Sequence, residues 1–443
     1  MEQFIYDFNS FLWSVYVLVP LLVFVSLYFT IRTKGIQFTM LGDTFRNLKS
    51  SGDAGEGNVS SLQAFAVGLA SRIGTGNLAG VAIALVSGGP GAIFWMWMIS
   101  LFGAVNSFVE STLAQVYKVR DKEVGFRGGP AYYIKYGLKK SWVATLFAGM
   151  LVSLYALSLV ALQSNTISTS IKNVAGEYAP NLDGGTVLLF AAIGLAAFTA
   201  FIIFGGAKRV VNYASTIVAV MAVIYLSMAA YVVLTNLSAV PAIFQMIFDD
   251  AFTGQAVAGG SLATIITIGF KRGLFSNEAG MGTAPNAAAS AATNHPIVQG
   301  QIQSLGVFVD TIVICTATAA IILISGVPLE GSDGIAITQS ALLTTVGTLA
   351  PLILTLCIFF FAFSTVLGIY FYAQANYEFL IPSGKGLNMY KMLIVLCVFI
   401  GSLSAIEIVW ELGDIATALM AVVNLLVLFP LMGKFMIVLK IKI

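Results

Sequence analysis

The chain consists of long apolar runs separated by short polar stretches. A helix needs about 20 apolar residues to cross the hydrocarbon core of a bilayer, and each run has about that length. The pattern therefore predicts an all-α polytopic membrane protein with eleven transmembrane helices. The expected spans are residues 11–31, 62–87, 91–118, 142–171, 186–206, 210–235, 259–284, 298–325, 346–375, 388–409 and 414–438.

Glycine-rich polar residues interrupt the second and the seventh of these spans near their middles. The interruptions are residues 71–77 (SRIGTGN) and residues 271–282 (KRGLFSNEAGMG). Non-helical backbone leaves N–H and C=O groups that lipid cannot satisfy, so at membrane depth it must face protein, ions or a watery cavity. Two such interruptions in one chain are typical of a secondary transporter whose binding site lies inside the bilayer.

The interrupted spans are five spans apart, so each one opens a block of five helices. Because five is odd, the second block crosses the membrane in the opposite sense, and we expect two inverted five-helix repeats whose first helices meet at mid-bilayer. The polar segment 33–60 and the mixed segment 239–258 are expected to be loops or interfacial segments. The chain then divides into an extra N-terminal helix with its loop, a first repeat, and an outer segment with the second repeat, at residues 1–60, 61–238 and 239–443.

The basic residues of the loops predict an orientation. Cytoplasmic loops of membrane proteins are enriched in Lys and Arg. If the N-terminus lies outside, Lys172 is the only basic residue in the loops on the outer side. We therefore expect a multi-pass protein of the cell membrane, surrounded by lipid, with its C-terminus in the cytoplasm. The basic residues on the expected cytoplasmic side are Arg32, Lys34, Arg46, Lys49, Lys118, Arg120, Lys122, Arg127, Lys135, Lys139, Lys140, Lys208, Arg209, Lys385, Lys391, Lys434, Lys440 and Lys442.

Composition excludes several other classes of protein. With 58% hydrophobic and 9% charged residues, the chain cannot cover itself with polar surface as a soluble domain does. It has no basic tail for nucleic acid, no phosphate-binding loop for an ATPase, and no nucleophile–base pair or metal-ligand cluster for an enzyme. The three cysteines lie inside apolar runs and suggest neither disulfides nor zinc. The sequence carries no signal for an oligomeric state.

Charged residues at the two interruptions are expected deep in the bilayer. At 1.5 Å per residue, Arg72 lies about 15 Å into its span and Arg272 about 20 Å into the other. Each cation costs roughly 2.5–3.5 kcal/mol there, so partners are expected, whether they only brace the broken helices or also serve transport. The expected buried ionic network consists of Arg72, Glu110, Lys271, Arg272, Glu278 and Asp310. If protons take part, Glu278 is the most plausible group to carry them.

The first interruption offers chemistry for two kinds of ligand. Its residues Gly74, Thr75, Gly76 and Asn77 present unpaired amides and the positive end of the following half-helix, which suit an anion such as a carboxylate. Carbonyl groups just before it, from Ala70 to Ile73, point the other way and suit a small cation such as Na⁺.

Polar side chains on intact spans add to these ligands. Ser364 and Thr365 place two hydroxyls in the apolar ninth span, where they either bind an alkali ion or bond back to their own helix. Gln163 in the fourth span either contacts a zwitterion or joins two helices.

The motifs resemble those of the alanine or glycine:cation symporter family, the sodium:alanine symporters. The resemblance rests on residues 68–82 (GLASRIGTGNLAGVA), 88–92 (GGPGA), 128–134 (GGPAYYI), 272–282 (RGLFSNEAGMG) and 308–311 (FVDT). It implies the five-plus-five inverted-repeat fold of the LeuT type and Na⁺-coupled uptake of small neutral amino acids such as alanine and glycine by alternating access. The alternative is a proton-coupled or glutamine-preferring transporter of the same fold.

The resemblance also implies roles for residues. It places the substrate carboxylate on the backbone of residues 74–77 and the other end of the substrate against the second interruption. The expected substrate site comprises Gly74, Thr75, Gly76, Asn77, Gln163, Phe275, Ser276, Asn277 and Gly280. The expected sodium site comprises the carbonyls of Ala70 and Ile73 with the hydroxyls of Ser364 and Thr365, and Na⁺ is the only metal expected.

Overall fold

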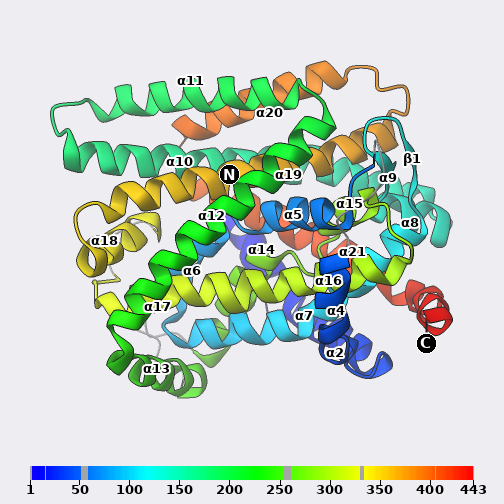
Figure 1. The fold of residues 1–443 in the computed structure, drawn as a ribbon, viewed down its shortest axis with the longest axis horizontal. Coiled ribbons are helices and arrows are strands. Elements are labelled where there is room, and N and C mark those ends of the chain that lie inside the picture. The colour runs from blue at the N-terminus through cyan, green and yellow to red at the C-terminus, as the bar shows by residue number, and fades with distance from the viewer. Residues whose placement is uncertain are drawn as a thin grey trace.

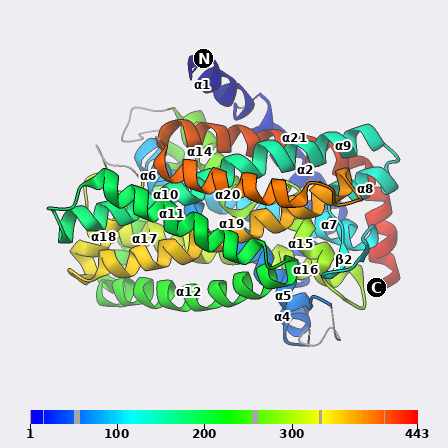
Figure 2. The same ribbon diagram turned by 90° about the horizontal axis from the view of Figure 1, so that it is seen from above.

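The computed structural model describes residues 2–14, 16–50, 58–253, 261–329, 334–404 and 406–442. In these ranges the chain is helical apart from loops and one two-stranded sheet, and most long helices run along the long axis of the molecule (Figures 1 and 2). Parts of the expected loops 33–60 and 239–258, the start of the seventh span at 259–260, and residue 405 of the tenth span lie outside the described residues.

The helices of the first half are α1 (Glu2–Leu12), α2 (Leu18–Arg32), α3 (Ile36–Thr39), α4 (Leu41–Ser50), α5 (Ser61–Arg72), the π-helical η1 (Gly76–Gly80), α6 (Val81–Gly88), α7 (Gly91–Val116), α8 (Pro130–Gly137), α9 (Ser141–Met150), the π-helical η2 (Leu151–Tyr155), α10 (Ala156–Tyr178), α11 (Gly184–Ile203) and α12 (Ala207–Thr235). Strands β1 (Val119–Asp121) and β2 (Gly125–Arg127) form an antiparallel hairpin between α7 and α8.

The helices of the second half are the 3₁₀ turn η3 (Leu237–Ala239), α13 (Val240–Thr253), α14 (Leu262–Asn277), α15 (Ala284–Ser290), α16 (Pro296–Phe308), the π-helical η4 (Val309–Cys315), α17 (Thr316–Ser325), α18 (Gly334–Val346), α19 (Ala350–Leu380), α20 (Leu387–Leu403) and α21 (Ile406–Lys442).

Seven stretches in the described part of the chain are helical, long and apolar enough to cross a membrane, and the bent pair Ser61–Arg72 and Gly76–Gly88 adds an eighth. This confirms the all-α polytopic class. Helices α2, α18 and α20 are apolar but shorter, so the number of eleven spans stays a prediction. The seven stretches are Gly91–Val116, Ser141–Tyr178, Gly184–Ile203, Ala207–Thr235, Pro296–Ser325, Ala350–Leu380 and Val409–Lys440.

The first interruption lies where the sequence places it. Helix α5 starts at a capping box, in which Ser60 and Gln63 bond to each other's backbone, and ends at Arg72. The chain then bends by 51° before it continues through η1 into α6. The glycines on either side of Thr75 explain why the helix does not run through.

The second interruption begins later than expected. Helix α14 continues through Asn277, so the prediction that the non-helical run starts at Lys271 is wrong. One glycine does not end a helix, and Gly273 is needed for packing, because a Cβ on it would lie 2.5 Å from Ile99 of α7. The true break is marked by positive φ angles at Glu278, Gly280 and Gly282, of 57°, 86° and 79°.

The expected first span, residues 11–31, is also wrong in its first third. Helix α1 ends at Leu12, and α2 starts only at Leu18. Pro20 lies in the first turn of α2, where its missing N–H costs no helical hydrogen bond, so the proline marks the start of a new helix. The expected division of the chain at residues 60 and 238 stays a prediction.

Candidate functional site

Two side-chain oxygens bind the backbone of the first break, one from Asn77 within the break and one from Gln163 on α10. The N–H of Gly74 donates to Asn77 Oδ1 at 3.0 Å, and the N–H of Thr75 donates to Gln163 Oε1 on α10 at 3.1 Å. Thr75, Asn77 and Gln163 are buried. Both acceptors are neutral amide oxygens, so these N–H groups point to positions where a carboxylate would be the stronger acceptor.

The two glycines of the first break lie in close contact with other elements. A Cβ on Gly74 would lie 2.5 Å from Thr365 Oγ1 and 2.9 Å from Gln163 Oε1. A Cβ on Gly76 would lie 3.1 Å from the Phe275 ring and 3.2 Å from the Cα of the next residue in α14. The break is therefore in direct contact with α10, α14 and α19, and glycine is required for this approach.

Oxygen atoms of α5 and α19 converge on one point beside the break. Thr365 Oγ1 lies 2.8 Å from the Ala70 carbonyl oxygen, 3.3 Å from that of Ile73 and 3.0 Å from that of Phe361. These are uncharged oxygen ligands, of the kind that unwound helices offer to Na⁺. The structure thus brings three of the four expected sodium ligands together and adds the Phe361 carbonyl, which sequence reasoning missed because every residue carries one.

Ser364, the fourth expected sodium ligand, faces a different neighbour. Its Oγ lies 2.9 Å from the Phe361 carbonyl oxygen and 3.9 Å from the sulfur of Met221 on α12. It shares one carbonyl with Thr365 but is directed toward α12, so its hydroxyl is less well placed for the same ion.

A buried carboxylate joins the two broken helices. Asp310 Oδ1 accepts from Asn77 Nδ2 at 2.7 Å, and its Oδ2 accepts from the hydroxyls of Ser276 at 2.8 Å and Thr311 at 2.9 Å. Asp310 is fully buried and lies in η4, where the wider π-helical turn displaces side chains from their α-helical positions. Asn77 of the first break and Ser276 in the last turn of α14 therefore share the same acceptor.

Glu278 connects the second break to α5 and the η2 turn. Its Oε1 accepts from the hydroxyls of Ser71 at 3.0 Å and Tyr155 at 2.7 Å, and its Oε2 accepts from the hydroxyl of Thr283 at 2.8 Å. All three donors are neutral, so the carboxylate is solvated by hydroxyls in place of water.

Glu110 of α7 binds the unwound backbone directly. Its two carboxylate oxygens accept from the N–H groups of Gly280 and Gly282, each at 3.1 Å, and from Asn424 Nδ2 of α21 at 2.7 Å. The carbonyl of Gly280 accepts from the same Asn424 at 2.9 Å. A carboxyl group and an amide side chain therefore bind backbone groups of the second break that lipid could not satisfy.

Lys271 and Arg272 have their charged partner outside the expected ionic network, whose acidic members are Glu110, Glu278 and Asp310. Both cations pair with Asp414 of α21, at 2.6 Å and 3.2 Å. Their partner differs because α14 stays helical to Asn277, so residues 271 and 272 face α21, whereas Ser276 one turn later faces η4. The only sequence signal for this pairing was the position of Asp414 at the start of the last apolar run.

Arg72 is bound by neutral groups and not by the acidic members of the expected network. Its guanidinium donates to the Gln303 carbonyl and to Ser107 Oγ, each at 3.0 Å, and no ion pair within 4.0 Å links it to a carboxylate in the described chain. Neutral partners thus bind this buried cation, as they bind the buried carboxylates around it.

The expected substrate residues fall into two groups. Gly74, Thr75, Gly76, Asn77, Gln163, Phe275 and Ser276 meet around the first break. Asn277 and Gly280 lie apart from them, because Asn277 donates to Thr311 Oγ1 at 3.1 Å and Gly280 is bound by Glu110. Trp410 of α21 belongs with the first group although the sequence did not indicate it, since its ring centre lies 5.2 Å from that of Phe275.

Comparison with known proteins gives results that agree with this geometry. The sequence model of the sodium:alanine symporter family matches residues 1–441. The chain is 48% identical to the amino-acid carrier protein AlsT of Bacillus subtilis, over 95% of this chain and 87% of that protein. It is 42% identical to the probable sodium/glutamine symporter GlnT of the same organism, over 97% of this chain and 88% of that protein.

A solved structure shares the fold. The transporter MhsT in complex with L-phenylalanine superposes with a TM-score of 0.51 at 14% sequence identity, covering 86% of this chain and 90% of that one. At this identity the likeness concerns the fold alone, and it confirms the expected LeuT-type architecture.

Removing the negative charge of Asp414 is expected to destabilise the protein strongly. Asp414→Asn leaves Lys271 and Arg272 without a charged partner, and breaking a buried ion pair from one side costs about 3–5 kcal/mol. Thermal unfolding of the purified protein in detergent measures the effect. The control is Asp43→Asn, which breaks an ion pair with Arg46 whose side chains are 54% and 86% exposed. Equal melting temperatures for the two variants would contradict the role of Asp414.

Proposed function

The chain belongs to the sodium:alanine symporter family, and we propose that it takes up small neutral amino acids, alanine and glycine first, together with Na⁺. One observation carries this proposal. Within the six residues Ala70–Thr75, the same backbone segment presents carbonyl oxygens to the Thr365 hydroxyl and N–H groups to the side-chain oxygens of Asn77 and Gln163. A cation and an anion bound there would share one piece of main chain, which is the physical basis of coupling.

The proposed substrate pose follows from the donors at the first break. The substrate carboxylate takes the N–H groups of Gly74 and Thr75, displacing the amide oxygens that bind them, and profits from the positive end of the half-helix η1–α6. The substrate side chain is directed toward Phe275 and Trp410, whose rings are in contact. With Gly76 already against Phe275, this wall favours a short side chain.

The proposed sodium site uses the oxygens of Ala70, Ile73, Phe361, Ser364 and Thr365. Carbonyl and hydroxyl oxygens are hard, neutral ligands, so the chemistry fits a monovalent alkali ion and does not fit a metal that requires thiolate or imidazole. The ion would replace the hydrogen bonds that the Thr365 hydroxyl makes to α5, and α19 would then be held to α5 through the ion.

In the proposed mechanism, each half of the chain supplies one broken helix to a common site that opens to the two sides in turn. The sequence division at residues 61–238 and 239–443 gives the two inverted repeats. From the distribution of Lys and Arg, we place the N-terminus outside and the C-terminus in the cytoplasm.

Two features favour an alternative substrate or ion. One relative is named as a probable sodium/glutamine symporter, so a longer polar side chain is the first alternative substrate. Glu278 and Asp310 are buried carboxylates bound by neutral donors, so either could take up a proton in place of Na⁺ coupling.

Transport by the purified protein in liposomes tests the proposal. We expect radiolabelled alanine to accumulate under an inward Na⁺ gradient, with glycine competing better than glutamine. Liposomes in choline with an inward proton gradient serve as the control. Uptake driven by the pH gradient alone would support the proton-coupled alternative. Stronger competition by glutamine than by glycine would support the glutamine-preferring alternative.

Removing the Thr365 hydroxyl is expected to weaken Na⁺ dependence specifically. Thr365→Ala deletes an oxygen that touches both Ala70 and Ile73, so the Na⁺ concentration for half-maximal uptake should rise at least about tenfold, the value of one hydrogen bond to a charged group. Ser364→Ala should raise this Na⁺ concentration less, and the double variant should raise it at least as much as Thr365→Ala does. Thr365→Ser, which keeps the hydroxyl, should restore the Na⁺ concentration of the parent protein. The exposed-face variant Thr344→Ala is the control. An unchanged Na⁺ dependence in the double variant would remove this site.

A large side chain at Gly76 is expected to abolish substrate binding without preventing membrane insertion. In Gly76→Leu the new side chain meets Phe275 and the α14 backbone, both already 3.1–3.2 Å from a Cβ, and fills the space assigned to the substrate. Gly194→Leu is the matched control, since no atom lies within 4 Å of a Cβ there. Alanine binding to purified protein measures the effect. Normal binding by the Gly76 variant would mean that the carboxylate binds elsewhere.

A further inference from the structure

The burial of the β1–β2 hairpin is not explained by substrate or ion binding. The hairpin lies at one end of the helix bundle, beside α8 and α15, and we call this the basic end because it carries Lys118, Arg120, Lys122 and Arg127 (Figure 1). It is too short to stand alone, yet Val124 and Arg127 are only 3% and 8% exposed. Neighbouring helices must therefore bury the hairpin.

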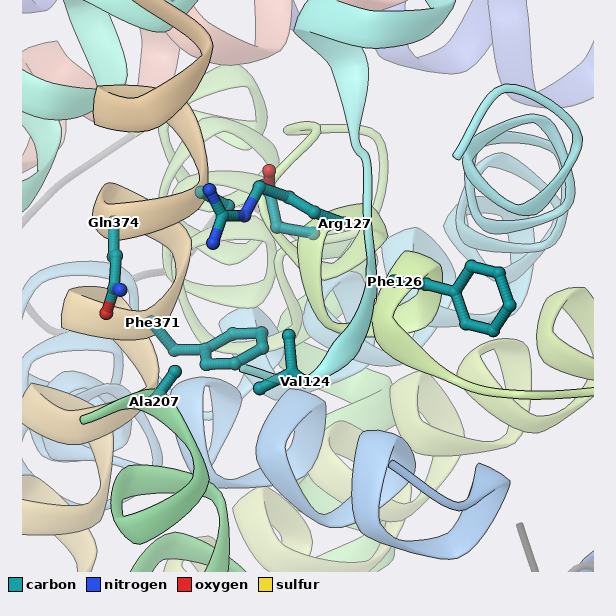
Figure 3. A pocket seen from close by; sticks show the side chains of 8 residues that line it. Val124, Phe126, Arg127, Ala207, Phe371 and Gln374 are labelled. Atoms are coloured by element: carbon teal, nitrogen blue, oxygen red, sulfur yellow. The ribbon is translucent and has the colours of Figure 1, made fainter. Parts of the chain in front are cut away.

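The hairpin fills the space between three helices. Val124 and Arg127 line a small cavity together with Ala207 of α12, Asn286 of α15, and Phe371 and Gln374 of α19. In Figure 3 the Arg127 guanidinium points toward Gln374, Val124 faces Phe371, and Phe126 points away from the cavity. The hairpin is therefore inserted between α12, α15 and α19.

The cavity lies between the candidate site and the basic end along α19. Phe371 follows Thr365 by six residues on α19, which is about 9 Å along the helix. Asn286 lies on α15, the half-helix that follows the second break. Elements α15 and α19 therefore connect the region of the two breaks with the cavity.

Polar contacts hold the hairpin to two of the three helices. Arg127 pairs with Asp121 across the hairpin at 2.5 Å and with Glu378 on α19, and Glu378 also accepts from Gln374 Nε2 at 2.9 Å. Glu123 Oε2 accepts from the N–H of Ala207, the first residue of α12, at 2.9 Å. Among these polar contacts, Arg127 is the residue whose charge is both buried and paired with carboxylates.

The motif that follows the hairpin explains its contact with α15. Gly128 lies so close to this half-helix that a Cβ on it would be 2.7 Å from the Cβ of Ala289. Gly129 has a φ of 123° and would place a Cβ on the Asn286 side chain, which in turn accepts from Asn376 of α19 at 2.8 Å. The two glycines thus let the chain press directly on α15.

From these contacts we infer that the β1–β2 hairpin closes the substrate path at the basic end, with Arg127 as the residue that positions it. The Arg127–Glu378 pair ties the hairpin to α19, while the glycines after β2 press the chain on α15, so opening the pair is expected to release the hairpin from α19. Arg127 does not touch the substrate. It sets how often the path opens on this side, and this role rests on the proposed function of the chain as an alternating-access transporter.

Side-specific labelling of a cysteine behind the hairpin tests this inference. Phe371→Cys places a thiol in the cavity, and a membrane-impermeant maleimide is added to sealed vesicles from each side in turn. The three natural cysteines are kept, and labelling of the same protein without Phe371→Cys is subtracted. The reaction requires neither Na⁺ nor amino acid, so its outcome does not depend on which substrate is transported.

We expect Arg127→Gln and Glu378→Gln each to raise the labelling rate at least tenfold, from one side only. Arg127→Lys, which keeps the charge, should remain within a few-fold of the parent. Lys122→Gln, which removes a positive charge at the exposed tip of the same hairpin, should leave the rate unchanged.

Three outcomes would overturn the inference: an unchanged rate in both Gln variants, an equal increase from the two sides, or an equal increase in Lys122→Gln. Monodisperse elution in detergent verifies that a variant is folded, and Glu378→Gln provides an independent test if Arg127→Gln does not fold. If labelling stays unchanged while Na⁺-driven alanine uptake is normal, the hairpin hypothesis fails and the proposed function stands.

Discussion

The need to satisfy backbone polar groups where water is scarce governs this structure. Two helices unwind inside the bundle, and each exposed N–H or C=O group must find a partner that lipid cannot supply. Intact helices provide these partners: Gln163 and Thr365 bind the first break, and Glu110 and Asn424 bind the second. The positions of α7, α10, α19 and α21 around the centre follow from this requirement.

The same requirement explains why the centre can bind a zwitterion and a cation. The partners of the first break are neutral, so a charged ligand group that takes their place forms a stronger hydrogen bond than the one it displaces. Three buried carboxyl groups, at residues 110, 278 and 310, stand near the breaks together with the cation Arg72, while the two cations of α14 share the single carboxylate of Asp414. The three carboxyl groups and Arg72 are bound by neutral groups of the protein.

Much of the fold could be predicted from the sequence, because hydrophobic length and glycine-rich interruptions act locally. The break after Arg72 was placed to within about two residues, since two glycines and a polar run leave no helical alternative. The second break was placed too early, because the single glycine between Lys271 and Asn277 does not end the helix, which ends only at the run of positive φ angles from Glu278. Proline and glycine mark such ends more reliably than polarity does.

The partners of charged side chains could not be predicted in the same way. Asp414 is 142 residues away from Arg272, and no local pattern indicates that α21 passes beside α14. The Phe361 carbonyl and the Trp410 ring joined the candidate site for the same reason, since their positions depend on how α19 and α21 pack. Conversely, Gly280 was assigned to the substrate by its motif, whereas its N–H serves to bind Glu110.

In the proposed function, one stretch of backbone at the first break binds the ion and the substrate together. Thermodynamic linkage then requires that each ligand tighten the binding of the other by the same factor. The direct measurement is the affinity of the purified protein for alanine over a series of Na⁺ concentrations, and for ²²Na⁺ with and without alanine. The account predicts equal and reciprocal increases in affinity; alanine binding that does not change with Na⁺ would contradict it.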